Sequence, residues 1–528
     1  MSNDTTNVLR DFDFCLAITQ QTINRQISDL WDRWLRDSRL TEGTTLKVFP
    51  VSPLGKQSPL GIQAELAPLS VNFVVPNGKP GQVEVTMHLK SGEVTYANTS
   101  EPDDNGMPTI AKCSIQNWQY TFLAQLSQQQ DSLDTLRNRS ADAAASVQQA
   151  LQKTGQPISH FEIESLLMDF TNLETQPSAT KTWSPRTIPA GALQQASVCL
   201  NTILPQRAGK FLLGTIVRRN RAAGPTPTFA VTSTAVRVYQ ERADRDASTL
   251  NYVGMFSGHP MPSGIDAAFV RMSDNWVDSA AMWRANGQLA GVMAISRASF
   301  LDNHLIPMFS RALGVPAVPV GNGSWSFTNG QDRQHRTKDL VKRYHKTGFS
   351  YKLVVTPTPG TNQLRLTGRI ASYYHYDAYT LDMGFLGGND HTEWMYFNGH
   401  RDIASSVRLV EQNGGSGFHI RADIPNSGYF GGVVVDRNTV GGFAVVTNGL
   451  GSAGKALGLL GNSPEEILSS AMHQQLSGIT QHLNQILQHL DLQLNHQTFV
   501  PPGGGEMNYS NVRFSHAGDL LCDAQYKR

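Results

Sequence analysis

Cysteine is scarce in this chain, with 4 residues in 528. Cys15, Cys113, Cys199 and Cys522 are far apart in the sequence, and no CxxC pair occurs. This spacing argues against a zinc site built from clustered thiolates. The polar first residues also lack the basic and apolar stretches of a secretory signal. We therefore predict free thiols in a cytoplasmic protein without disulfides, with signal-less export as the alternative.

Charge and long apolar runs are limited as well. Only 16% of the residues are charged, and the formal net charge is +1, so nucleic acid is not an expected partner. No run reaches the ~18 apolar residues that indicate a membrane-spanning helix. Two local basic runs, 217–221 and 333–346, are interpreted as solvated loops, with a patch for anions or lipid headgroups as the alternative.

Motifs with a catalytic meaning are weak. The segment 449–456 satisfies both GxxxxGK and GxGxxG, but Ala456 stands where a P-loop needs a hydroxyl for Mg²⁺. A flexible glycine-rich loop is the preferred interpretation. A second group has no known metal or acid–base spacing and is interpreted as turn residues: His391, Glu393, His400 and Asp402. We predict no catalytic residues, no metal site and no cofactor, with an enzyme of unknown type as the least favoured alternative.

The last part of the chain carries a long amphipathic pattern, from Pro464 to about Leu494. Ser463 suits an N-cap, and Pro464 suits the first helical position. Apolar residues recur at spacings of three and four and form one stripe: Ile467, Leu468, Met472, Leu476, Ile479, Leu483, Ile486, Leu487 and Leu490. The stripe predicts a helix that is buried against other elements, and an ordinary core helix is its simplest interpretation.

A second helix is predicted near the other end, over residues 14–36. One face of it is apolar and contains Leu16, Ile23, Ile27, Leu30, Trp31, Trp34 and Leu35. Further helices are predicted over 133–151, 190–204 and 299–313, and Pro307 should kink or end the last of them.

Strand patterns dominate between the terminal helices. Residues 82–89 alternate strictly, and Ser91-Gly92 predicts a turn back into 93–96. Alternation over 118–126 and short apolar runs over 161–173, 211–217 and 229–239 predict more strands. The glycine-rich stretch 315–450 predicts a separate antiparallel region.

Three stretches resemble one known family. The end of the chain, from Phe499-Val-Pro-Pro-Gly-Gly-Gly505 to Tyr526, is similar to the C-terminal signature of the clostridial forty-seven-kilodalton proteins, which are encoded with OrfX proteins beside botulinum-type neurotoxins. The start, Phe12 to Ile27 with Asn24, resembles the opening helix of that family. Residues 291–307 resemble its central strand and helix.

The resemblance implies the TULIP (tubular lipid-binding) architecture. This is an α+β fold in which an elongated, strongly curved antiparallel sheet rolls around long amphipathic helices. We expect residues 1–314 to form the N-terminal part, 315–450 the glycine-rich β region, and 451–528 the C-terminal helix with closing strands. In relatives the space between sheet and helix is an apolar groove for lipid chains.

We therefore predict a soluble lipid-binding protein that acts with a toxin or another secreted partner. Lipid or another molecule with an acyl chain is the expected ligand. Binding to a protein partner and peripheral contact with a membrane are further hypotheses. The residues expected to line the groove are Ile23, Ile27, Trp31, Leu476, Ile479, Leu483, Ile486 and Leu490. The alternative is a structural or chaperone-like interaction protein whose TULIP shell has a packed core and no ligand.

Overall fold

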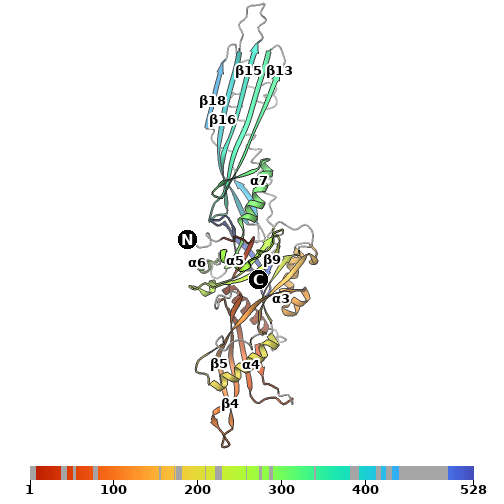
Figure 1. The fold of residues 1–528 in the computed structure, drawn as a ribbon, viewed down its shortest axis with the longest axis vertical. Helices are drawn as coiled ribbons and strands as arrows, with labels where there is room; N and C mark the ends of the chain where they lie inside the picture. Colours follow the sequence, from red (N-terminus) through yellow and green to blue (C-terminus); the bar gives the residue numbers. More distant parts are fainter. Residues whose placement is uncertain are drawn as a thin grey trace, which may run out of the picture.

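The computed structural model shows an elongated molecule built mainly from antiparallel strands (Figure 1). It describes residues 8–36, 44–51, 55–74, 81–153, 156–171, 173, 181–208, 210–220, 229–256, 258–272, 276–284, 289–337, 341–380, 392–411, 418–423, 431–438 and 498–527. Three sheets follow one another along the long axis, and the pairings between their strands are antiparallel. The predicted elongated α+β architecture is confirmed.

The central sheet joins segments from both ends of the chain, in the order β20-β21-β11-β1-β10-β9. Its strands are β1 (Phe14–Thr19), β9 (Val231–Tyr239), β10 (Thr249–Phe256), β11 (Leu289–Ile295), β20 (Glu506–Phe514) and β21 (Leu520–Lys527). β1 and β10 are buried along their whole lengths, because the sheet is covered on both faces. This sheet connects the two larger sheets above and below it.

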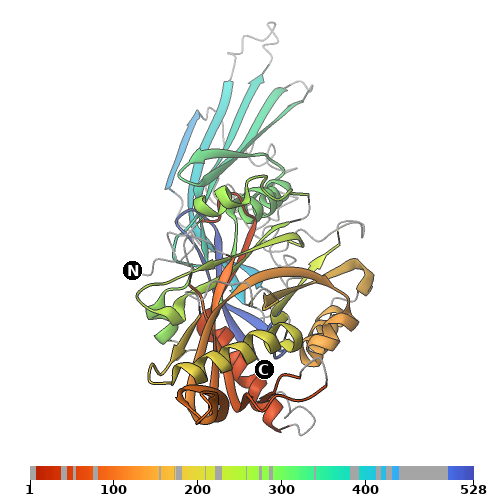
Figure 2. The same ribbon diagram turned by 60° about the horizontal axis from the view of Figure 1, so that its bottom comes forward.

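An eight-stranded sheet forms the lower end in Figure 1, in the order β19-β8-β6-β5-β4-β3-β2, with β7 beside β5. Its strands are β2 (Thr45–Val48), β3 (Gly61–Asn72), β4 (Gln82–Pro102), β5 (Pro108–Asp131), β6 (Phe161–Asp169), β7 (Thr182–Ser184), β8 (Lys210–Arg219) and β19 (Thr498–Val500). Figure 2 shows this sheet curving around the helices α1 (Gln20–Arg36) and α4 (Ala190–Ile203), which contact β3 and β4.

The third sheet extends to the opposite end and contains strands from the region predicted as glycine-rich antiparallel structure. They are β12 (Ala317–Gly321), β13 (Ser324–Thr337), β14 (Val341–Pro357), β15 (Gln363–Thr380), β16 (Thr392–Glu411), β17 (Phe418–Asp423) and β18 (Gly431–Asn438). They follow one another in chain order, except that β18 returns to pair with β16.

Shorter helices cover the sheets. They are α2 (Leu133–Arg139), α3 (Ala141–Lys153), α5 (Ile265–Arg271), α6 (Ser279–Arg284) and α7 (Ile306–Leu313), with the short or π-type turns η4 (Ile158–His160), η6 (Leu204–Ala208), η7 (Arg245–Ala247) and η8 (Ala298–Leu305). Ser140 divides the helix predicted over 133–151, and its hydroxyl caps α3 through the N–H of Ala143. Pro307 lies in the first turn of α7, where its missing N–H is tolerated.

Two predicted boundaries are wrong. The helix expected from residue 14 starts at Gln20, because Phe14–Thr19 is a central strand buried on both faces, and a continuous apolar run does not distinguish a strand from a helix. The turn expected at Ser91-Gly92 is absent from β4, which continues to Pro102. Gly92 has φ +139°, and a Cβ there would collide with the backbone of Gln63, so this glycine permits close strand contact.

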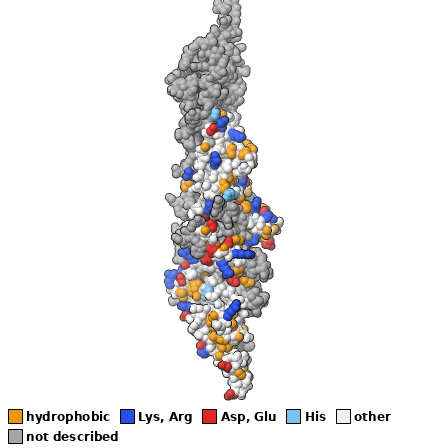
Figure 3. Space-filling model, turned by 90° about the vertical axis from the view of Figure 1, so that its left-hand side faces the viewer, with side chains coloured by type: hydrophobic (Ala, Val, Ile, Leu, Met, Phe, Trp, Pro, Cys, Tyr) orange, Lys and Arg blue, Asp and Glu red, His pale blue; other side chains and the backbone are white. Residues whose placement is uncertain are grey.

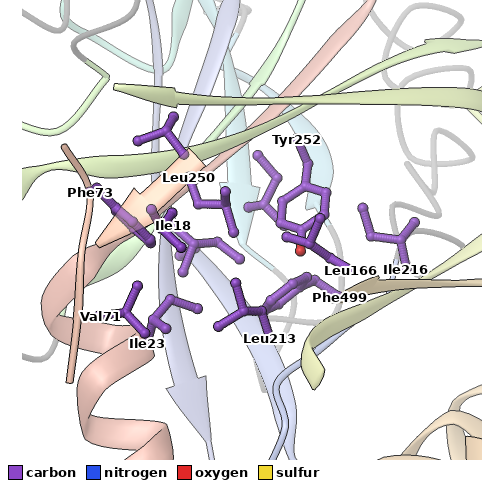
Figure 4. Packing of buried hydrophobic residues seen from close by; sticks show 14 of the residues in the cluster. Ile18, Ile23, Val71, Phe73, Leu166, Leu213, Ile216, Leu250, Tyr252 and Phe499 are labelled. Atoms are coloured by element: carbon purple, nitrogen blue, oxygen red, sulfur yellow. The ribbon is translucent and has the colours of Figure 1, made fainter. Parts of the chain in front are cut away.

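The main hydrophobic core lies where the central sheet meets the eight-stranded sheet. Figure 4 shows side chains from α1, β3, β8, β10 and β19 converging there. Phe499 packs against Tyr252 with tilted rings whose centroids lie 5.1 Å apart, and it lies against Gly214, where a Cβ would collide with its ring. The segment that follows residue 497 is thus packed into the N-terminal half.

A buried carboxylate links three parts of the central region. Asp519 is 3% exposed and accepts hydrogen bonds from the N–H groups of Leu9 (3.0 Å) and Arg297 (2.7 Å). Burial raises the pKa of Asp519 and outweighs the opposite effects of these backbone donors and of nearby arginines.

This raised pKa predicts a pH-dependent contribution to stability. Because the folded state binds the proton more tightly than the unfolded state, the contribution of Asp519 grows as pH falls through its folded pKa. We expect the unmodified protein to gain stability relative to Asp519→Asn as the pH is lowered from about 7 to about 4. Urea unfolding of both proteins across this range measures the difference, and a constant difference or one of opposite sign would refute the assignment.

Candidate ligand-binding cavity

An apolar cavity of about 300 Å³ lies between α1, the end of α4 and the eight-stranded sheet. It is lined by Ile27, Leu30, Trp31, Trp34, Thr45, Leu46, Leu66, Ala67, Leu69, Met87, Phe122, Phe170, Ile203, Leu204 and Phe211. Its volume is at the lower end of the range of roughly 300–1,000 Å³ that is common for small-molecule sites.

The lining determines which chemistry the cavity can accept. Among the described residues that line it, Thr45 is the only polar one, and none is charged. A buried polar or charged group would lose its hydrogen bonds to water there without replacement. An apolar chain fits this surface, and a polar headgroup would have to stay near the exposed Thr45 or outside.

Helix α1 supplies one wall. Ile27, Leu30, Trp31 and Trp34 recur at helical spacing, and the rings of Trp31 and Trp34 lie 5.8 Å apart. The helix is fixed to β3 by Asn24, whose amide donates to the carbonyl of Val71 (2.9 Å) and accepts from its N–H (2.7 Å). These two hydrogen bonds fix the distance between α1 and β3.

Two buried aromatic rings form part of the cavity lining. Phe122 and Phe170 meet edge to face with centroids 5.5 Å apart, and they are 1% and 2% exposed. Phe122 also contacts Tyr120, whose hydroxyl donates to Asn201 of α4 at 2.8 Å. Burial raises the pKa of Tyr120 well above its usual range, so the phenol stays neutral.

The structure places the predicted groove residues in three different situations. Ile27 and Trp31 line the cavity. Ile23 is fully buried in the packed core beside Val71 (Figure 4) and does not line it. The five residues of the predicted C-terminal helix lie outside the described residues: Leu476, Ile479, Leu483, Ile486 and Leu490. The role of all eight in lipid binding stays a prediction.

Most lining residues come from strands and were not predicted. Met87 and Phe122 belong to the buried sets of β4 and β5, which alternate with polar residues. That alternation was visible in the sequence and identified an inward face. It did not indicate which inward residues border a cavity, since this depends on how α1 and α4 approach the sheet.

Two of the polar residues that the sequence analysis considered as catalytic or metal-binding have structural positions in a strand. His400 and Asp402 lie in the strand β16, so the expected turn is wrong, and Asp402 pairs with Arg369 on β15 at 2.7 Å. His391 and the loop 449–456 lie outside the described residues. Among the residues that the structure describes, no three His, Cys, Asp or Glu side chains form a group suited to a metal ion.

Two further features bear on the sequence-based expectations. None of the four cysteines, all of which lie in the described part of the chain, forms a disulfide, and Cys15, Cys199 and Cys522 are buried. In the described part of the chain, none of the helices combines the length and the apolar character that crossing a membrane requires.

Comparisons with known proteins give limited information. No family model matches the chain, and no curated protein matches it. Among solved structures, a crystal structure of lipopolysaccharide binding protein is similar over 98% of this chain and 99% of that chain. The sequence identity is 9% and the TM-score is 0.31, a level of similarity that identifies neither a relative nor a ligand.

Proposed function

We propose that this protein binds lipid by holding an acyl chain in the cavity between α1 and the curved eight-stranded sheet. The supporting observation is the lining, in which fourteen of fifteen residues are apolar. Each methylene that leaves water contributes about 0.8 kcal/mol, so one chain can bind without any charged contact. We propose no catalytic step for this site.

The remaining parts of the proposal are more specific. We propose that the protein acts beside a toxin or another secreted protein partner, and this part is supported by the sequence resemblance. We also propose a cytoplasmic location, and this part is supported by the sequence itself. Peripheral membrane contact is supported by exposed apolar side chains on elements of the lower end, where Figure 3 shows hydrophobic patches. Four apolar side chains in this part of the chain are each more than half exposed: Leu35, Val51, Met107 and Ile110.

A displacement assay tests the proposed function. Dansyl-labelled undecanoic acid should become fluorescent in the presence of the protein, and unlabelled fatty acids should displace it. Short polar carboxylic acids, which carry the same headgroup without a long chain, should not displace it. Absence of any fluorescence change in the delipidated protein would favour the alternative of a TULIP shell that works through protein contacts alone.

A further inference from the structure

The proline–glycine loop Pro501–Gly505 connects β19 with β20 and is enclosed by other elements. Ser140, at the start of α3, donates its hydroxyl hydrogen to the carbonyl of Pro502 at 2.8 Å. The N–H of Gly505 donates to Ser146 Oγ at 2.9 Å. The hydroxyl of Tyr526 on β21 donates to the carbonyl of Gly504. The loop is therefore held from two sides by α3 and the central sheet.

The glycines are needed for this close packing. Gly504 has φ +75°, and a Cβ there would lie 2.8 Å from Ser146 Oγ and from the carbonyl oxygen of Asp142. A Cβ on Gly503 would collide with the guanidinium of Arg33. Loop, α1 and α3 thus meet at a point where no larger residue fits.

Arg33 connects this point to the cavity wall. Its Nη2 donates to the carbonyl of Gly503 at 2.6 Å, and its Nη1 pairs with Asp142 Oδ2 at 2.7 Å. Arg33 lies in the sequence between Trp31 and Trp34, two residues of the cavity wall, but on an adjacent face of α1. The guanidinium therefore fixes the last turns of the helix from outside the cavity.

A neighbouring polar group does not share this task. Gln26 is 1% exposed and lies near Gly503, where a Cβ would be 3.4 Å from its Oε1. Neither the oxygen nor the nitrogen of its amide has a hydrogen-bond partner. Of these two side chains of α1, Arg33 is thus the one that donates a hydrogen bond to the loop.

We infer that Arg33 is a positioning residue for the acyl-chain cavity and that the loop Pro501–Gly505 is its anchor. This inference rests on the proposed function. With the anchor in place, Leu30, Trp31 and Trp34 are held against the opposite wall. Without it, the last turns of α1 can move away from the sheet, and a bound chain can leave faster.

The test compares Arg33→Met with the unmodified full-length protein. Methionine keeps an unbranched side chain of good helix propensity and removes both contacts. We expect dansyl-labelled undecanoic acid to dissociate about tenfold faster, as for the loss of the charge-assisted hydrogen bond to Gly503, because the solvent-exposed pair with Asp142 adds little. We also expect faster amide hydrogen exchange in residues 30–36 without any ligand.

Arg36→Met is the matched control. Arg36 lies one turn later, is exposed, and bonds to the carbonyl of Asp32 in its own helix at 3.1 Å. The Arg36→Met variant should change neither the dissociation rate of the fatty acid nor the amide hydrogen exchange of residues 30–36. Equal effects of the two variants, or no effect of Arg33→Met, would overturn the inference.

Gly503→Ala provides a second variant that leaves α1 unchanged. Its new methyl group would displace the guanidinium from the loop, so the exchange in residues 30–36 should again rise. Unchanged exchange in Gly503→Ala would contradict the role of the loop as anchor. Since exchange needs no ligand, it tests the inference even if the unmodified protein does not bind the probe, a result that would refute the proposed function alone.

Discussion

Leu66→Asp should lower the affinity for a fatty acid by at least about 100-fold while the protein stays folded. Leu66 lies on β3, lines the cavity and is half-buried. A carboxylate at this position would face the acyl chain and lose hydration whenever a ligand enters. Because one side of Leu66 already meets solvent, the empty protein can keep the charge hydrated and tolerate the change.

The control for this prediction is Val198→Asp. Val198 lies on α4 and is 51% exposed, and it does not line the cavity. The substitution adds the same charge to the same end of the molecule and should leave the affinity unchanged. Titration of both variants with dansyl-labelled undecanoic acid gives the comparison. Equal affinities of Leu66→Asp and the unmodified protein would place the ligand elsewhere.

Phe300→Ala should produce the largest loss of stability, about 3–5 kcal/mol. Phe300 is fully buried in η8, and its ring lies 6.2 Å from those of Phe229 and Phe514. Removing it leaves an empty space between segments from the middle and from the end of the chain. These neighbours are held in the central region and cannot all close around the missing ring.

The loss of stability should not be accompanied by a loss of binding. Phe300 is absent from the cavity lining, so the fatty-acid affinity measured below the unfolding transition should stay the same. Chemical unfolding gives the first quantity, and fluorescence titration gives the second. A loss of stability below about 1 kcal/mol in Phe300→Ala would contradict close packing around this ring.

The sequence predicted individual helices and strands because burial leaves periodic patterns. The helical spacing of Ile27, Leu30, Trp31 and Trp34 identified the inward face of α1. Alternation along β4 and β5 identified inward strand residues, including Met87 and Phe122. Both patterns are local, so a single sequence is enough to find them.

Other features depend on contacts that are distant in the sequence. Phe14–Thr19 forms a strand because β10 and β11 flank it, and residues near 250 and 292 are not visible in a local window. Gly92 has the appearance of a turn residue, but its role is a close approach to β3. The use of Pro501–Gly505 as an anchor for Arg33 follows from tertiary packing and not from the motif alone.

Native mass spectrometry of the purified full-length protein tests the central claim most directly. The account predicts added mass from an acyl-chain ligand, its removal by extraction with organic solvent, and its return when a fatty acid is supplied. The same treatment should leave Leu66→Asp without added mass. A protein that carries no ligand after purification and takes up none from an excess of fatty acid would contradict the proposal of a lipid-binding cavity.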